Sequence, residues 1–141
     1  MAAARALVLD CSLTLAWYLE DERTDFTEAV LDELGRSEVW LPALWMLEFP
    51  NALIVAVKRG RISDGWRCDV LQRATLLPLK VDAEQVPLER ISNIATRFNI
   101  TTYDAAYLEL AMRRKLKLAT LDKALVTAAN SANHPVLTET R

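Results

Sequence analysis

Short apolar segments alternate along this chain with longer segments of helical spacing, and this alternation restricts the possible folds more than any other feature. The apolar segments are predicted to be strands at 6–9, 39–41, 79–81, 116–120 and 136–137. Between them, apolar residues recur at the spacing of one helix face. Strands that alternate with helices are typical of α/β domains with a mostly parallel sheet. The sequence therefore predicts an α/β fold.

Capping residues and prolines mark the ends of the predicted helices. Helices are expected at 13–19, 25–34, 42–59, 63–76, 85–98 and 122–129, and from Thr101 or Thr102 to the basic residues at 113–115. Pro42 is expected to open its helix, and Pro87 lies in the first turn of another, where a missing N–H costs nothing. Ser63 is an N-cap candidate. The helix at 85–98 has four predicted core positions: Leu88, Ile91, Ile94 and Ala95.

Length and composition favour one compact domain over residues 1–141. Of the 141 residues, 52% are hydrophobic, which allows a core without metal or disulfide staples. The net charge of −2 argues against a passive nucleic-acid coat, which relies on a basic surface. Basic residues still gather in two groups, and cations at helix C-termini are one interpretation of them. The groups are Lys58, Arg59 and Arg61, and Arg113, Arg114, Lys115 and Lys117.

The cysteine count and the apolar stretches bear on the compartment. Cys11 and Cys68 are too few for a disulfide scaffold and lack the spacing of metal ligands. Reduced thiols are the expectation for a cytoplasmic protein. The longest apolar stretch is interrupted by Glu48 and Asn51 and is too short to span a membrane. We therefore expect a cytoplasmic protein without a membrane span.

Two aspartates follow predicted strands. Asp10 comes directly after the first strand, and Asp122 closely follows the fourth. The carboxyl ends of strands are where open α/β sheets place their ligand crevices. Both aspartates also precede short helices, where Asp is a favoured N-cap. Considered one at a time, each is better explained as a helix cap than as a ligand.

Asp104 and Glu48 differ in what their surroundings imply. Asp104 lies three residues after Thr101, which matches the outline of a capping box. Glu48 instead lies in an almost wholly apolar segment, so it is expected to point into a largely buried region, although a surface position on a groove-lining helix stays open. A buried carboxylate needs a cationic partner, a raised pKa or a metal ion. Pro50 is expected to kink this helix and could redirect Glu48.

An all-oxygen set of ligands favours a hard divalent cation. Four carboxylates at one crevice would repel one another unless a cation neutralised them. Oxygen ligands without His or Cys suit Mg²⁺ or Mn²⁺ rather than zinc. The only histidine, His134, is expected in a surface loop, which disfavours a mechanism with His as the general base. We therefore expect metal-assisted chemistry at a phosphoryl group.

Four segments of the chain resemble the PIN-domain family, and within it the VapC-type toxins of bacterial toxin–antitoxin pairs. They are Leu9-Asp10-Cys11-Ser12, Glu48-Phe49-Pro50-Asn51-Ala52-Leu53, Thr102-Tyr103-Asp104-Ala105-Ala106-Tyr107 and Leu118-Ala119-Thr120-Leu121-Asp122. They occur in the family's order and span nearly the whole chain. Pro50 departs from the small or helix-forming residues that the family would have there.

The resemblance implies a central parallel sheet of five strands in the order 3-2-1-4-5, flanked by helices. It implies that Asp10 and Asp104 are the principal metal ligands and that Glu48 and Asp122 complete the site directly or through water. Ser12, Asn51 and Thr120 match the family's polar supporting positions. Local alternatives remain for these three: a helix cap, a surface amide and a strand residue.

The predicted function is that of a Mg²⁺- or Mn²⁺-dependent endoribonuclease that acts as the toxin of a toxin–antitoxin pair. The resemblance implies an RNA substrate, a homodimer and a cognate antitoxin that inserts a segment near the acidic site. Segments around Trp45 and Phe49 and around Trp17 and Tyr18 are candidate contacts, although core packing explains these aromatics equally well.

Three alternatives stay open. One is a PIN-domain nuclease that processes RNA or DNA without an antitoxin, and another is a non-catalytic interaction module of the same fold. The third is a phosphoacceptor receiver domain, which would use an Asp after the third strand, as in Val81-Asp82, and a Lys after the fifth. Thr138 stands where that Lys would be.

Overall fold

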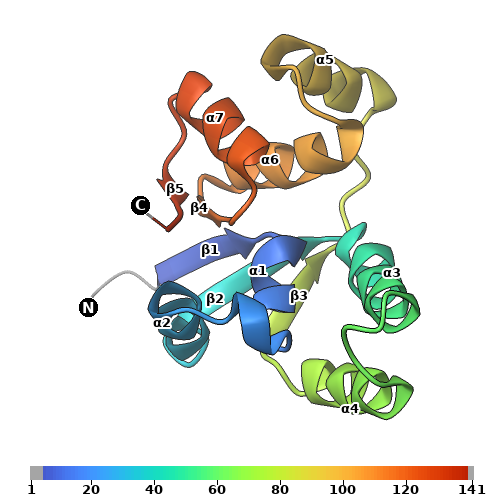
Figure 1. Ribbon diagram of the computed structural model, residues 1–141. Coiled ribbons are helices and arrows are strands. Elements are labelled where there is room, and N and C mark those ends of the chain that lie inside the picture. Colours follow the sequence, from blue (N-terminus) through green and yellow to red (C-terminus); the bar gives the residue numbers. More distant parts are fainter. Residues whose placement is uncertain (1–4, 140–141) are drawn as a thin grey trace.

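A computed structural model describes residues 5–139. Its centre is a five-stranded parallel sheet in the order β3-β2-β1-β4-β5 (Figure 1). The strands are β1 (Arg5–Leu9), β2 (Ser37–Pro42), β3 (Leu79–Asp82), β4 (Lys117–Ala119) and β5 (Val136–Leu137). The predicted fold class and strand order are therefore confirmed. β1 lies in the middle of the sheet, between β2 and β4. The chain first adds β2 and β3 on one side of β1 and then adds β4 and β5 on its other side.

Within residues 5–139, seven α-helices connect the strands, together with a short 3₁₀ helix at Glu20–Glu22. They are α1 (Cys11–Ala16), α2 (Asp25–Glu33), α3 (Trp45–Lys58), α4 (Asp64–Thr75), α5 (Leu88–Phe98), α6 (Thr102–Arg114) and α7 (Lys123–Ser131). Crossovers between parallel strands are right-handed. The connections from β1 to β3 and those from β3 to β5 run in opposite directions across the sheet, so their helices cover opposite faces. Figure 1 shows this division, with α5, α6 and α7 on one side of the sheet and α1 to α4 on the other.

Local caps account for several helix starts. Thr24 accepts a hydrogen bond from the N–H of Thr27 in a reciprocal capping box at α2. The Ser63 hydroxyl accepts from the N–H of Trp66, which confirms the predicted cap of α4. Thr101 caps α6 in the same way. Such caps depend on residues within one turn, which is why the sequence reveals them.

Three expectations about prolines and core positions are wrong. Pro42 ends β2 instead of opening a helix, and α3 begins at Trp45. Pro87 is the N-cap of α5 instead of lying in its first turn. Leu88, an expected core residue, is 91% exposed because it is the first residue of α5 and faces solvent, while Ala95 is buried. In each case tertiary pairing or the end of an element overrode local spacing.

The aromatic residues around the first and third helices pack inside the molecule. The rings of Trp45 and Phe49 stack with centroids 4.8 Å apart, and both side chains are buried. Trp17 is buried as well and donates from Nε1 to the carbonyl of Thr27 at 2.8 Å. Core packing is therefore the confirmed interpretation of these three aromatics. Within residues 5–139, no helix has the length and apolar character needed to cross a membrane.

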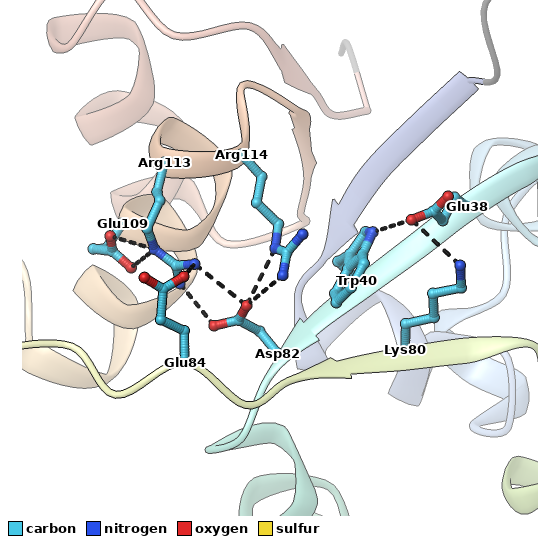
Figure 2. A network of polar contacts seen from close by, with 8 residues as sticks. All are labelled: Glu38, Trp40, Lys80, Asp82, Glu84, Glu109, Arg113 and Arg114. Atoms are coloured by element: carbon cyan, nitrogen blue, oxygen red, sulfur yellow. Dashed lines mark hydrogen bonds and ion pairs between the residues drawn. The ribbon is translucent and has the colours of Figure 1, made fainter.

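An ionic network attaches the C-terminal end of α6 to the edge of the sheet (Figure 2). Asp82, at the end of β3, is 5% exposed and accepts hydrogen bonds from the guanidinium groups of Arg113 and Arg114. Arg113 also binds Glu84 and the buried Glu109, and Arg114 lies 3.6 Å from the ring centroid of Trp40. Asp82 is therefore a structural residue, unlike the phosphoacceptor site of a receiver domain. These two arginines of the second basic group serve the fold.

Candidate active site

Asp10 occupies the carboxyl end of β1, next to β4. Its N–H donates to the Ala119 carbonyl at 2.9 Å, and its side chain is almost fully buried. The carboxylate Oδ2 accepts hydrogen bonds from Ser12 Oγ at 2.8 Å and from Thr120 Oγ1 at 2.7 Å. Although Asp10 stands at the N-cap position of α1, its side chain makes no capping bond. The capping interpretation of Asp10 is therefore wrong, and two hydroxyl groups orient its carboxylate instead.

The same hydroxyl groups bind the loop that carries Asp122. Thr120 Oγ1 accepts from the N–H of Asp122 at 2.9 Å, and Ser12 Oγ accepts from the N–H of Leu121 at 3.2 Å. The loop after β4 is thus attached to the loop after β1. This attachment follows from the strand order, because β1 and β4 are neighbours although they are far apart in the sequence.

Asp122 and Asp104 both lie at helix starts. Asp122 Oδ1 accepts from the N–H groups of Ala124 and Leu125 at the start of α7, so its predicted capping role is confirmed. Asp104 lies in the first turn of α6, and its N–H donates to Thr101 Oγ1 at 3.1 Å. A carboxylate in either place is favoured by the partial positive charge of the helix N-terminus.

Glu48 is half-buried near the start of α3. Its Oε1 accepts a hydrogen bond from the hydroxyl of Tyr107 on α6 at 2.5 Å. Burial, and next the charge of Asp10, raise the pKa of Glu48 in spite of this bond. Sequence reasoning missed Tyr107, although its position three residues after Asp104 places both on one side of α6. Asn51 is exposed on α3, and the described hydrogen bonds around the carboxylates do not involve it.

The four carboxylates Asp10, Glu48, Asp104 and Asp122, called the acidic cluster below, act on one another electrostatically. Burial raises the pKa of Asp104 to about 6, and the charges of the other three add to this rise. Burial and the charge of Asp122 raise the pKa of Asp10, against the hydrogen bonds from Thr120 and Ser12. Such charge interactions weaken with distance, so they indicate that the four groups lie near one another. The fold therefore brings four acidic residues from separate segments to one edge of the sheet.

The donor set of the acidic cluster fits a hard divalent cation. It offers carboxylate and hydroxyl oxygens, which Mg²⁺ and Mn²⁺ prefer. Burial raises the pKa of the neighbouring Cys11 thiol, so this side chain stays protonated and is a poor ligand. His134 contacts the Leu116 carbonyl at the opposite end of β4. Within residues 5–139, no three His, Cys, Asp or Glu side chains are already grouped so that they could hold a metal ion.

Comparison with known proteins places the chain in a family. A model of the PIN domain matches residues 7–130. Ribonuclease VapC3 of Pyrobaculum aerophilum is 30% identical over 121 residues, which cover 84% of this chain and 91% of the relative.

Solved structures share the architecture. The PAE2754 protein of Pyrobaculum aerophilum superposes with a TM-score of 0.69 at 25% identity, over 91% of this chain and 87% of that chain. VapBC2 of Rickettsia felis, solved with a DNA fragment from its promoter, has a TM-score of 0.69 at 10% identity, over 94% and 98% of the two chains, and supports the fold alone. The family model covers most of the chain and the fold agrees with it, so the chain belongs to the PIN domain family.

Proposed function

We propose that the protein is an endoribonuclease that hydrolyses RNA with Mg²⁺ or Mn²⁺ bound at the acidic cluster. The observation that carries this proposal is the meeting of four carboxylates at the carboxyl edge of β1 and β4, where their charges help to raise the pKa of Asp104 to about 6. Such a group is costly to keep ionised without a cation. The likeness to ribonuclease VapC3 supports RNA as the substrate.

Each residue of the cluster has a proposed role. Asp10 and Asp104 are the principal ligands, and Glu48 and Asp122 complete the site directly or through water. A bound divalent cation would polarise a phosphoryl oxygen and stabilise the leaving oxygen. Ser12 and Thr120 hold the Asp10 carboxylate through their hydroxyl groups, which keeps its second oxygen available.

Asn51 remains a predicted supporting residue. It lies one turn after Glu48 on α3 and its exposed amide could reach a bound water or the substrate. Ser12 and Thr120, in contrast, contact a carboxylate of the cluster directly.

The biological role that we propose is that of a toxin held in check by a cognate antitoxin, in a cytoplasmic homodimer. The likeness to ribonuclease VapC3, together with the resemblance of the sequence motifs to VapC-type toxins, supports this role. A short open reading frame beside the gene, encoding a protein that co-purifies with this chain, is the expected observation. A gene without such a neighbour would favour an RNA-processing PIN nuclease.

Cleavage-site mapping on total RNA, with and without Mg²⁺, tests the activity. We expect Mg²⁺-dependent products from the wild type and none from Asp10→Asn or Asp104→Asn, because each substitution removes a ligand charge but keeps the size of the side chain. Asp69→Asn is the matched control, since Asp69 is exposed on α4. Unchanged cleavage by both site variants would refute the assignment. A wild type without metal-dependent products would favour a non-catalytic module.

A further inference from the structure

Tyr107 reaches one member of the acidic cluster from inside the core. Its side chain is 0% exposed, and its hydroxyl donates to Glu48 Oε1 at 2.5 Å. We propose that Tyr107 is a positioning residue, which holds the Glu48 carboxylate in the orientation that binds a divalent cation. This inference rests on the proposed metal-dependent function.

The contact restricts a side chain that would otherwise be mobile. A glutamate loses much rotamer freedom when it is ordered, and that cost falls on cation binding if the carboxylate is free beforehand. The Tyr107 ring lies fully inside the core, so its hydroxyl is held in place. Because Oε1 accepts the bond from this hydroxyl, Oε2 keeps its full capacity to bind a cation or its water.

The same contact joins two helices that each carry a cluster residue. Tyr107 is three residues after Asp104 on α6, and residues at this spacing are neighbours on a helix surface. One side of α6 therefore presents the Asp104 carboxylate and the donor to Glu48 on α3. The position of Glu48 relative to Asp104 is thus defined by a direct side-chain contact between the helices.

Pro50 makes this contact more important. A proline inside a helix lacks the N–H that would bond four residues back, here to the carbonyl of Met46. The backbone of α3 around Glu48 therefore lacks one of its helical hydrogen bonds. The hydrogen bond from Tyr107 on α6 orients the Glu48 carboxylate independently of this backbone. The missing backbone bond at Pro50 therefore does not leave the side chain without an orienting contact.

The decisive variant is Tyr107→Phe, which removes the hydroxyl and keeps the ring in the core. We expect the dissociation constant for Mn²⁺, measured by electron paramagnetic resonance, to rise at least about tenfold, as for losses of groups that orient metal ligands. The melting temperature without metal should change little. Tyr103→Phe is the matched control, because Tyr103 lies exposed on the same helix. This substitution is expected to leave the Mn²⁺ affinity unchanged.

A double-mutant cycle separates positioning from general damage. If Tyr107 acts through Glu48, Tyr107→Phe should have no further effect on Mn²⁺ affinity in a Glu48→Ala background. An equal loss in both backgrounds would overturn the proposal. Wild-type affinity in Tyr107→Phe would overturn positioning alone and leave the ribonuclease proposal standing. A wild type that neither binds Mn²⁺ nor cleaves RNA with Mg²⁺ would overturn both.

Proton magnetic resonance of the wild type provides a second measurement in case the variant does not fold. The buried Tyr107 hydroxyl proton is expected as a slowly exchanging downfield signal that shifts when Mg²⁺ is added. A signal that stays unchanged at saturating Mg²⁺ would contradict the proposal.

Discussion

Asp82 and Asp104 show how neighbouring charges control the ionisation of an aspartate. Burial alone would raise the pKa of Asp82, yet hydrogen bonds and charge from Arg113 and Arg114 outweigh it and the pKa is lowered. Asp104 has acidic neighbours instead, and burial and repulsion act in the same direction. One aspartate is therefore stabilised as an anion by the fold, whereas the other lacks a compensating cation.

The raised pKa of Asp104 predicts a pH dependence of stability in the metal-free protein. The folded value of about 6 exceeds the ordinary 3.8, so the folded state binds more protons between these values. The free energy of unfolding should therefore fall as pH rises from about 4 to about 6. Asp104→Asn should reduce this fall, to which the raised pKa values of Asp10 and Glu48 also contribute, and should give a higher melting temperature than the wild type at pH 7.

Thermal melts from pH 4 to pH 8 with a chelator measure this effect, and Asp69→Asn serves as the control. Added Mg²⁺ should stabilise the wild type more than Asp104→Asn. A clearly lower melting temperature of metal-free Asp104→Asn at pH 7 would instead support a purely structural role at the start of α6.

The first turns of α6 and α7 have both a structural role and a proposed functional role. Thr101 and Asp122 cap these helices by contacts within one turn. The same turns deliver Asp104 and Asp122 to the edge of the sheet, beside Asp10. A helix start at the carboxyl edge of a sheet can supply both a cap and a site residue, so the confirmed cap at Asp122 is compatible with its proposed role in the acidic cluster.

Two substitutions of Asp122 should separate these roles. Asp122→Asn keeps an N-cap of equal strength, so stability should stay near that of the wild type while RNA cleavage is lost. Asp122→Ala removes the cap as well and should cost about 1 kcal/mol of the free energy of unfolding. Chemical denaturation and the RNA assay together check both outcomes. Equal stability of the two variants would argue against the cap, and full activity of Asp122→Asn would exclude Asp122 from the site.

Across the molecule, α6 connects the sheet to the edge that carries the acidic cluster. It packs on β1, β2 and β4, its first turn carries Asp104, and its last turn binds Asp82 at the end of β3 (Figure 2). Glu109 within it is almost fully buried and pairs with Arg113 and with Arg90 of α5. The ionic network therefore ties together α5, α6 and the outer edge of the sheet.

Loss of the network should destabilise the whole fold. Asp82→Asn leaves Arg113 and Arg114 without their main anion, and breaking a fully buried pair costs about 3–5 kcal/mol. We expect Asp82→Asn to lower the free energy of unfolding by about 2 kcal/mol. The loss is smaller than for a fully buried pair because the side chains of Arg113 and Arg114 are 17% and 33% exposed, so solvent screens their interaction with Asp82. Because the pKa of Asp82 is lower in the folded than in the unfolded protein, its ionised carboxylate adds stability at pH values above the unfolded pKa. This stability is lost as the pH falls through the folded pKa.

Denaturant unfolding at pH 7 and at acid pH measures this contribution. Asp64→Asn is the matched control, because Asp64 forms an exposed pair with Arg67 and should leave stability essentially unchanged. Equal effects of the two substitutions would mean that the network on α6 contributes no more than a surface ion pair.

The sequence predicted much of the fold and pointed to the four acidic residues of the candidate site, but it left the role of Asp10 open and missed Tyr107. The five strands and the cap at Ser63 were predictable because their signals are local. Asp10 was ambiguous, since the same residue type caps helices and binds cations. Tyr107 gave no separate signal, because a tyrosine at a core position of a helix looks like packing until its hydroxyl has a partner.

The sequence by itself determined the α/β class, the helix starts capped by Ser63, Thr101 and Asp122, and the identity of the acidic residues, because these depend on side chains a few positions apart. Only the tertiary structure decided which groups meet. Thr120 binds Asp10 across 110 positions of the chain, and Tyr107 binds Glu48 across 59. Such pairs follow from strand order and from the helix packing that buries whole faces, and local spacing does not encode either of them.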